Sequence, residues 1–347
     1  MSVTSFDVAR LAKVSQSTVS RALRGDPSIA AATVRRVQAA AAQLNYVPSE
    51  RARDLSTGNT RRIGMLVDLD NPLWALLVGS LHDMLAERGY RLTLLAGHGD
   101  EQSIEASLAG GGIDGAIVST VSLHSRLPQL LARRGVPTVL LHRYTDDSDV
   151  DASVADNHAG GALAARMLLD AGHTRIGALL GPADTSTGRD REAGFREQLD
   201  AAGVQLRPEW VRRGAFDFAH GRASLPALIH GRDAPTALLC ANDSIAFGAL
   251  DAAFAGGLRV PEDVALTGFD DLAEASWASV SLTTVAVPFA DMLRSALSLL
   301  IERIGGHTGS ARRVVHGVTP VLRRTHGCLP PATESPVVDL SRESSAT

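Results

Sequence analysis

Polar side chains that could read a base sequence gather near the start of the chain. Five of them lie within six consecutive positions: Gln16, Ser17, Thr18, Ser20 and Arg21. Gln16 and Arg21 can each form paired hydrogen bonds with the edge of an adenine or a guanine. The hydroxyl groups of Ser15, Thr18 and Ser20 suit phosphate oxygens, and such contacts position a protein on DNA. The segment therefore predicts contact with a DNA duplex.

Two short helices must hold these side chains outward. Apolar residues recur at a spacing that lets helices over 5–11 and 16–23 share one small core, and a third helix over 31–44 closes the bundle. The apolar residues of the first part are Val8, Leu11, Val14, Val19 and Leu23. The pattern predicts a helix-turn-helix whose second helix lies in the major groove.

Positive charge is concentrated in the same part of the chain. Residues 1–62 contain ten Arg or Lys against four Asp or Glu, a net charge of +6. The rest of the 347 residues contain 24 against 34, a net charge of −10. A basic head on an acidic body is expected when one end of a protein approaches phosphates. The overall formal charge of −4 therefore does not exclude nucleic acid as a partner.

From Arg62 onward, short apolar runs alternate with amphipathic stretches. Runs such as 63–67 and 115–119 predict buried strands, and 73–88 predicts a helix between strands. This alternation is typical of parallel sheets covered by helices on both faces. The pattern restarts with a helix near 158–171. Two such α/β lobes predict a cleft at the carboxyl ends of their strands, where small ligands bind.

Several motifs resemble those of the lactose and galactose repressor family. In the head they are Asp7-Val8-Ala9, Val14-Ser15, Thr18-Val19-Ser20-Arg21-Ala22-Leu23 and Leu44-Asn45-Tyr46-Val47-Pro48. In the body they continue in order to about residue 328, and they include Asp68 to Trp74, Gly172-His173-Thr174-Arg175-Ile176, Asn242-Asp243 and Gly268-Phe269-Asp270-Asp271.

The resemblance implies an N-terminal all-α helix-turn-helix head and an α/β two-lobed core with parallel sheets, similar to periplasmic binding proteins. It implies a repressor that binds a pseudo-palindromic operator in double-stranded DNA as a homodimer, controlled by a small-molecule effector in the interlobe cleft. We expect this effector to be a sugar or a sugar derivative. The expected domains are a head over 1–47, a hinge helix and linker over 48–61, a first lobe over 62–157 and 289–316, a second lobe over 158–288 and 317–328, and a disordered tail over 329–347.

The resemblance also assigns roles to single residues. Leu55 would wedge into a central minor-groove base step, Ala52 would let two hinges pack, and Thr33 joins the DNA-binding residues. The effector-binding residues carried over are Asp70, Trp74, Arg143, Arg191, Phe216, Asn242, Asp270 and Phe289. The arginine fork and the polar oxygens suit hydroxyl groups, and the flat aromatic rings suit the apolar face of a pyranose.

Plain structural roles stay open for these residues. Leu55 could pack on the core domain, Arg191 could form a surface salt bridge, and Asp270 could cap a turn. Trp74 and Phe216 could be ordinary core residues.

Other classes of protein have less support in the sequence. There is no G-x-S-x-G elbow, no phosphate-binding glycine loop and no close metal-binding pair, so we expect no enzyme, cofactor or metal site. A sugar hydrolase or phosphorylase would bind the same compounds but would have no use for the head. A regulator whose effector is a phosphocarrier protein would keep the head, and it would tolerate substitution of Arg191 or Trp74.

The chain offers few signs of export. Its two cysteines, Cys240 and Cys328, are too few for a disulfide framework, and no charged leader or long apolar segment occurs. We therefore expect a cytoplasmic, nucleoid-associated protein that does not contact membranes.

Overall fold

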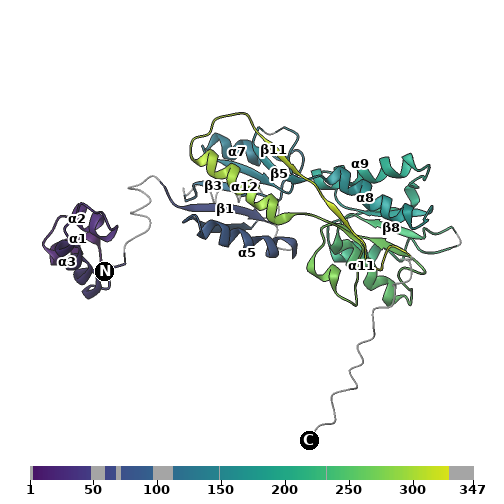
Figure 1. Cartoon of the computed structure of the whole chain (residues 1–347), viewed down its shortest axis with the longest axis horizontal. Helices are drawn as coiled ribbons and strands as arrows, with labels where there is room; N and C mark the ends of the chain where they lie inside the picture. Colours follow the sequence, from purple (N-terminus) through teal and green to yellow (C-terminus); the bar gives the residue numbers. More distant parts are fainter. Residues whose placement is uncertain are drawn as a thin grey trace, which may run out of the picture. The chain divides into compact units, whose positions relative to one another are not determined.

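The computed structural model describes residues 3–47, 59–67, 72–96, 112–147, 149–231 and 233–327. The chain divides after Arg61 into two compact units (Figure 1). The first contains the predicted head and the second contains both predicted lobes. Each unit has its own hydrophobic core.

The first unit is a bundle of three helices, which confirms the all-α head. Buried Val8, Val19 and Val37 come one from each helix and meet in the centre. Helix α1 ends at Ala12, and its C-cap Lys13 adopts a left-handed conformation with φ 53° that turns the chain into the next helix. The helices are α1 (Ser5–Ala12), α2 (Gln16–Leu23) and α3 (Ala31–Gln43).

A six-stranded parallel sheet organises the first lobe of the second unit. Helices α5 (Pro72–Ala86) and α12 (Phe289–Ile304) pack on one face, and α7 (Leu127–Arg133) packs on the other. The strands are, in spatial order, β11 (Arg313–His316), β5 (Asp151–Ala155), β4 (Thr138–Leu141), β3 (Gly115–Val118), β1 (Arg62–Val67) and β2 (Arg91–Ala96). The inner strands β1, β3 and β4 are buried on both faces, which explains their almost continuous apolar sequences.

A four-stranded parallel sheet organises the second lobe. Helices α8 (Asn157–Asp170) and α9 (Ser186–Ala201) cover one face, while α10 (Phe218–Ser224) and α11 (Asp243–Ala255) cover the other. The strands are, in spatial order, β7 (Val211–Arg213), β6 (Ile176–Leu180), β8 (Ala237–Cys240) and β9 (Ala265–Thr267). Two short 3-10 helices, η1 (Pro208–Trp210) and η2 (Ala273–Ser276), follow α9 and β9 in the chain.

The chain passes between the two sheets three times. It leaves β5 for α8, returns from β10 (Thr284–Ala286) to α12, and leaves β11 for β12 (Thr319–Val321), which pairs antiparallel with β10. The first lobe is thus built from two separate parts of the sequence. These findings confirm the predicted α/β fold with two parallel sheets.

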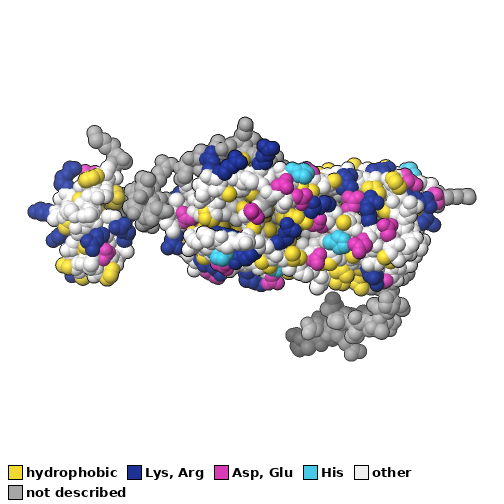
Figure 2. All heavy atoms as spheres, turned by 90° about the horizontal axis from the view of Figure 1, so that it is seen from above, with side chains coloured by type: hydrophobic (Ala, Val, Ile, Leu, Met, Phe, Trp, Pro, Cys, Tyr) yellow, Lys and Arg dark blue, Asp and Glu magenta, His cyan; other side chains and the backbone are white. Residues whose placement is uncertain are grey.

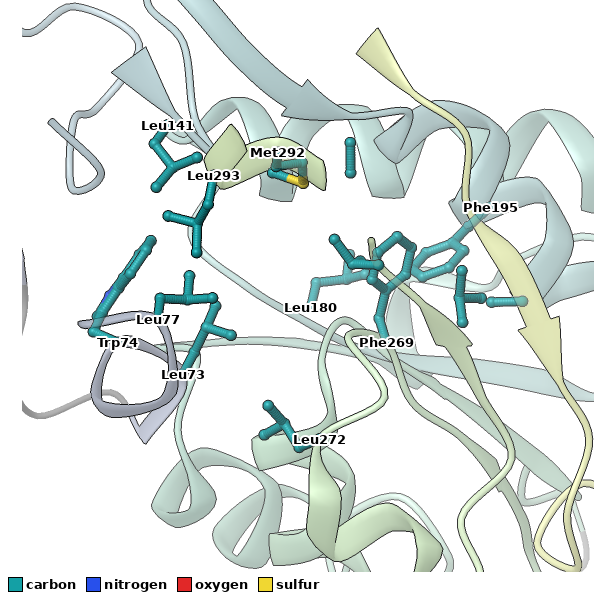
Figure 3. Packing of buried hydrophobic residues seen from close by; sticks show 14 of the residues in the cluster. Leu73, Trp74, Leu77, Leu141, Leu180, Phe195, Phe269, Leu272, Met292 and Leu293 are labelled. Carbon is teal, nitrogen blue, oxygen red and sulfur yellow. The ribbon is translucent and has the colours of Figure 1, made fainter. Parts of the chain in front are cut away.

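Apolar residues of both lobes belong to one buried cluster. Trp74 and Leu77 contribute to it from the first lobe, and Leu180 and Phe269 contribute from the second (Figure 3). Helices α8 and α9 also approach each other at backbone distance. A Cβ added at Gly194 would lie 2.0 Å from the carbonyl oxygen of His158. The helix that carries Arg191 therefore packs directly against α8.

Candidate functional site

The polar face of α2 is presented at the surface of the first unit. Ser15 begins the helix as its N-cap, because its Oγ accepts a hydrogen bond from the amide of Thr18 at 3.1 Å. The same Oγ lies 2.8 Å from the hydroxyl groups of Ser17 and Thr18. Ser15, Gln16 and Ser17 are exposed, while Thr18 and Ser20 are half-buried. A helix with this face can bring side chains to base edges.

Arg21 is exposed, but its guanidinium has partners within the head. Its Nε donates to Asp26 at 2.8 Å, and its Nη2 donates to the hydroxyl of Ser28. Hydrogen bonds from Ser28 and Arg21 lower the pKa of Asp26. The sequence interpretation missed this arrangement, although Asp26 lies only five positions after Arg21. The contacts with Asp26 and Ser28 orient the guanidinium of Arg21 along the turn that follows α2.

The structure describes only some of the remaining residues that were predicted to bind DNA. Thr33 is half-buried in the first turn of α3. Ala52 and Leu55 lie outside the described residues, as do most of the hinge and the whole of the predicted tail. The head also carries exposed basic side chains, and Figure 2 shows dark blue Lys and Arg side chains spread over the small unit. Those exposed in the head include Arg10, Lys13, Arg35 and Arg36.

Seven of the eight predicted effector-binding residues are described, and direct contacts in the second unit link five of them: Arg143, Arg191, Phe216, Asn242 and Asp270. The eighth, Asp70, lies outside the described residues. Phe216 is at the centre, with the guanidinium of Arg143 at 5.6 Å and that of Arg191 at 6.0 Å from its ring centroid. Its carbonyl accepts a hydrogen bond from Asn242 at 3.4 Å. Residues from both lobes thus meet at Phe216.

Arg191 is fully enclosed by its partners and is only 1% exposed. Its Nε donates to Asn157 at 2.8 Å, Nη1 donates to the carbonyl of Ala241 at 2.7 Å, and Nη2 donates to Asp270 at 3.1 Å. Its guanidinium also stacks 3.7 Å from the ring centroid of Phe269. The alternative of a surface salt bridge is therefore wrong. Two of the five guanidinium hydrogens have no partner among these three hydrogen bonds.

Two buried carboxyl groups lie near this arginine. Burial raises the pKa of Asp270 to about 6, and the positive charge of Arg191 opposes the rise. Asp270 has a left-handed φ of 116° and accepts from Arg191, so its side chain binds an arginine instead of capping a turn. Asp243 accepts from Thr284 at 2.6 Å and from the amide of Leu272 at 2.8 Å. Burial, reinforced by Asp270, raises the pKa of Asp243 well above its usual range.

Asn242 and Trp74 also have structural roles. The Asn242 side chain is the N-cap of α11, since its Oδ1 accepts from the amide of Ile245 at 3.0 Å. Trp74 is 2% exposed and packs in the core beside Leu73 and Leu77 (Figure 3). The core alternative therefore holds for Trp74, whereas Phe216 and Phe289 are half-buried.

His142 is a member of the set that the sequence interpretation missed. Its ring meets Trp74 edge to face at 5.5 Å and lies 5.9 Å from the ring of Phe289. It is 5% exposed, and its buried Nδ1 has no hydrogen-bond partner among the described residues. Burial, with Arg191 and Arg143 nearby, lowers the pKa of His142 well below its usual value. Its position directly after an apolar strand was the available signal.

The described residues offer no group of three metal-ligating side chains. Within the same ranges, no helix is both long and apolar enough to cross a membrane.

Two family models match the chain. Residues 6–49 match the bacterial regulatory proteins of the lacI family. Residues 165–326 match the periplasmic binding protein-like domain. The two matches cover the head and most of the second lobe.

Individual proteins match over nearly their whole length. The HTH-type transcriptional repressor PurR of Aliivibrio salmonicida is 34% identical over 303 residues, which are 86% of this chain and 91% of that protein. The ribose operon repressor of Escherichia coli K12 is 35% identical over 321 residues, which are 91% of this chain and 97% of that protein.

Two solved structures are also similar to this chain over nearly its whole length. The lac repressor dimer bound to operator and the anti-inducer ONPF has a TM-score of 0.83 at 26% identity, covering 94% of this chain and 100% of that one. The complex of the transcriptional regulator CelR with cellobiose has a TM-score of 0.71 at 31% identity, covering 93% and 100%.

Proposed function

The chain belongs to the lacI family of bacterial regulatory proteins, and we propose that it represses transcription from a pseudo-palindromic operator under the control of a sugar. It is a DNA-binding transcriptional regulator and not an enzyme, because relatives that it matches over more than nine tenths of their length are transcriptional repressors. The site of action that we propose is the cytoplasm, at the nucleoid.

The proposed DNA contacts rest on the geometry of α2. Gln16 and Arg21 reach base edges, and Ser15, Ser17, Thr18, Ser20 and Thr33 bind the backbone phosphates or support the reading helix. The exposed polar face that begins at the N-cap Ser15 is the observation that supports this function most directly. Ala52 and Leu55 extend the proposal to a hinge that bends the minor groove.

We also propose a homodimer that joins two second lobes. Three large aromatic side chains stay exposed there: Phe218 at 44%, Phe254 at 60% and Trp277 at 57%. Phe218 begins α10 and Phe254 lies near the end of α11, the two helices that cover the same face of the sheet. Exposed aromatic groups on one face are typical of a protein interface.

The effector proposal rests on the contact set around Phe216. Arg143, Arg191 and Asp270 supply charged groups, and Asn242 supplies an amide. Phe216 and Phe289 supply half-buried rings, Trp74 lies in the core against His142, and Asp70 completes the proposed residues. A sugar suits this combination of apolar rings and polar groups. The names of the relatives support a sugar, since they include ribose operon repressors and a regulator in complex with cellobiose.

Effector binding would control the affinity for DNA through the relative position of the two lobes. We propose lobe boundaries at 157/158, 288/289 and 316/317, where the chain passes between the sheets. A ligand that prefers the closed lobes shifts the population toward that state, and the hinges of the two subunits move with the first lobes. An inducer releases DNA in this way, and a corepressor acts in the opposite sense.

A thermal-shift screen tests the effector proposal. Sugars and nucleobases are added to the wild type, to Arg191→Ala and to the control Arg196→Ala, whose side chain pairs with Glu192 on the same helix. A true effector raises the melting temperature of the wild type and the control but not of Arg191→Ala. A compound that stabilises all three equally would remove Arg191 from the site. A phosphocarrier that shifts every variant equally would favour a protein effector.

A further inference from the structure

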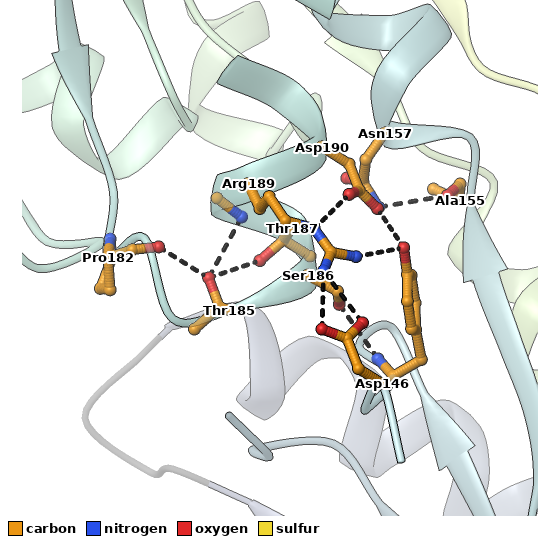
Figure 4. A network of polar contacts seen from close by, with 11 residues as sticks. Asp146, Ala155, Asn157, Pro182, Thr185, Ser186, Thr187, Arg189 and Asp190 are labelled. Carbon is orange, nitrogen blue, oxygen red and sulfur yellow. Dashed lines mark hydrogen bonds and ion pairs between the residues drawn. The ribbon is translucent and has the colours of Figure 1, made fainter. Parts of the chain in front are cut away.

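A second cluster of polar contacts joins the two lobes outside the proposed effector residues. It comprises Tyr144 and Asp146 from the loop after β4 and Arg189 and Asp190 from the start of α9. Figure 4 labels Asp146, Arg189 and Asp190. We call these four residues the Arg189 cluster. None of the four belongs to the predicted effector-binding residues.

Arg189 is the centre of this cluster. Its Nη1 donates to both carboxylate oxygens of Asp146 at 2.9 Å, and its Nη2 donates to the hydroxyl of Tyr144 at 2.8 Å. Its Nε donates to Asp190 at 3.0 Å. Tyr144 in turn donates its hydroxyl hydrogen to Asp190 at 2.7 Å. One guanidinium therefore ties two first-lobe side chains to a second-lobe helix, in the fork geometry that only arginine provides.

Two further hydrogen bonds, both donated by backbone amides of the first lobe, also join the two lobes. The amide of Tyr144 donates to Ser186 Oγ at 3.0 Å, and the amide of Leu123 donates to the carbonyl of Asp184 at 2.7 Å. Both donors belong to the first lobe and both acceptors lie at or just before the start of α9. These amides lose their partners when the lobes separate, so they report on that motion.

The cluster shares its backbone segments with the proposed effector site. Arg143 directly precedes Tyr144, and Arg191 lies two residues after Arg189 on α9. A change in the distance between the loop and α9 therefore alters both sets of contacts together. Arg189 and Asp146 are each 38% exposed, so solvent can replace their ion pair when the lobes open.

We propose that Arg189 is a positioning residue for effector binding, which holds the loop after β4 against α9 and so favours the closed arrangement of the two lobes. The statement about the effector rests on the proposed function. The statement about lobe closure does not, because it concerns contacts within this chain alone.

Hydrogen exchange of the full-length protein, without DNA or effector, tests the proposal. Arg189→Gln is expected to raise exchange at the amides of Leu123 and Tyr144 by about five- to tenfold, the loss expected for charge-assisted hydrogen bonds that are partly exposed. Arg189→Lys keeps one ion pair and should restore part of the protection. The amide of His142, which donates to Ser153 within the first lobe at 2.9 Å, should not change.

Arg196→Gln is the matched control, since Arg196 lies on the same helix and pairs with Glu192 four residues earlier. It should leave the amides of Leu123 and Tyr144 unchanged. The proposal fails if Arg189→Gln leaves both amides protected, if it exposes the amide of His142 equally, or if Arg196→Gln has the same effect. Failure here would leave DNA binding untouched, and absence of operator binding would leave this result standing.

Discussion

Arg21 is held by Asp26 and Ser28, so contact with a base must replace those bonds. Arg21→Ala should weaken binding to a specific operator by about 1–3 kcal/mol while changing binding to random duplex much less. Arg21→Lys keeps the charge and loses the fork, so it should retain only the random-duplex affinity. Fluorescence anisotropy with both duplexes measures the difference. An equal loss on the two duplexes would show that Arg21 binds phosphate only.

His142 links stability to pH. Its folded pKa lies below its unfolded value, so the unfolded chain binds more protons, and this contribution to stability is lost as the pH falls below about 6.5. His142→Asn tolerates the left-handed φ of 70° and does not titrate. Relative to the wild type, its free energy of unfolding should fall less between pH 7 and pH 5.5, by at most about 1.4 kcal/mol per pH unit. Parallel urea curves check this, and identical pH slopes would contradict it.

Elements with strong periodicity could be predicted closely from the sequence. The helix over 16–23 agrees with the structure to the residue, and the strands over 63–67 and 115–119 each agree to within one residue. The predicted helix near 158–171 corresponds to α8, which begins one residue earlier because Asp156 caps it, accepting from the amide of Ala159 at 2.9 Å.

Contacts between distant elements could not be predicted from spacing. Arg191 and Asp270 lie 79 positions apart, and only the family resemblance connected them. His142 belongs to no motif, and its significance comes from a buried nitrogen without a partner, which is a property of packing alone. The same holds for Arg189, two of whose three partners, Tyr144 and Asp146, come from the first lobe.

Helices α8 and α9 depend on glycine where they touch. In Gly194→Ala the new Cβ would lie 2.0 Å from the carbonyl oxygen of His158 and 2.9 Å from the amide nitrogen of Ala162, so the helices must separate. We expect a loss of about 1–3 kcal/mol or more in urea unfolding. Gly79→Ala in α5 is the matched control, because nothing lies within 4 Å of its Cβ. It should gain up to about 1 kcal/mol, and a similar loss in both variants would refute the packing argument.

Assembly of the whole molecule is proposed to depend on the exposed aromatic groups of the second lobe. Phe254→Glu places a charge on that face, so it should convert a dimer into a monomer and weaken operator binding through loss of the second head. Phe6→Glu, at a side chain 66% exposed in the head, is the control for added charge and should leave the oligomeric state unchanged. Analytical ultracentrifugation distinguishes the outcomes. A Phe254→Glu protein that sediments like the wild type would move the interface elsewhere.

Sequence-specific DNA binding by the full-length protein is the central claim, and selection from random duplexes tests it most directly. Repeated rounds at physiological salt should enrich a pseudo-palindromic site that binds at least about a thousandfold more tightly than random duplex. Two half-sites are expected because a symmetric dimer presents two copies of α2. If no sequence is enriched, with or without the compounds that stabilise the protein, the account of this chain as an operator-binding repressor is contradicted.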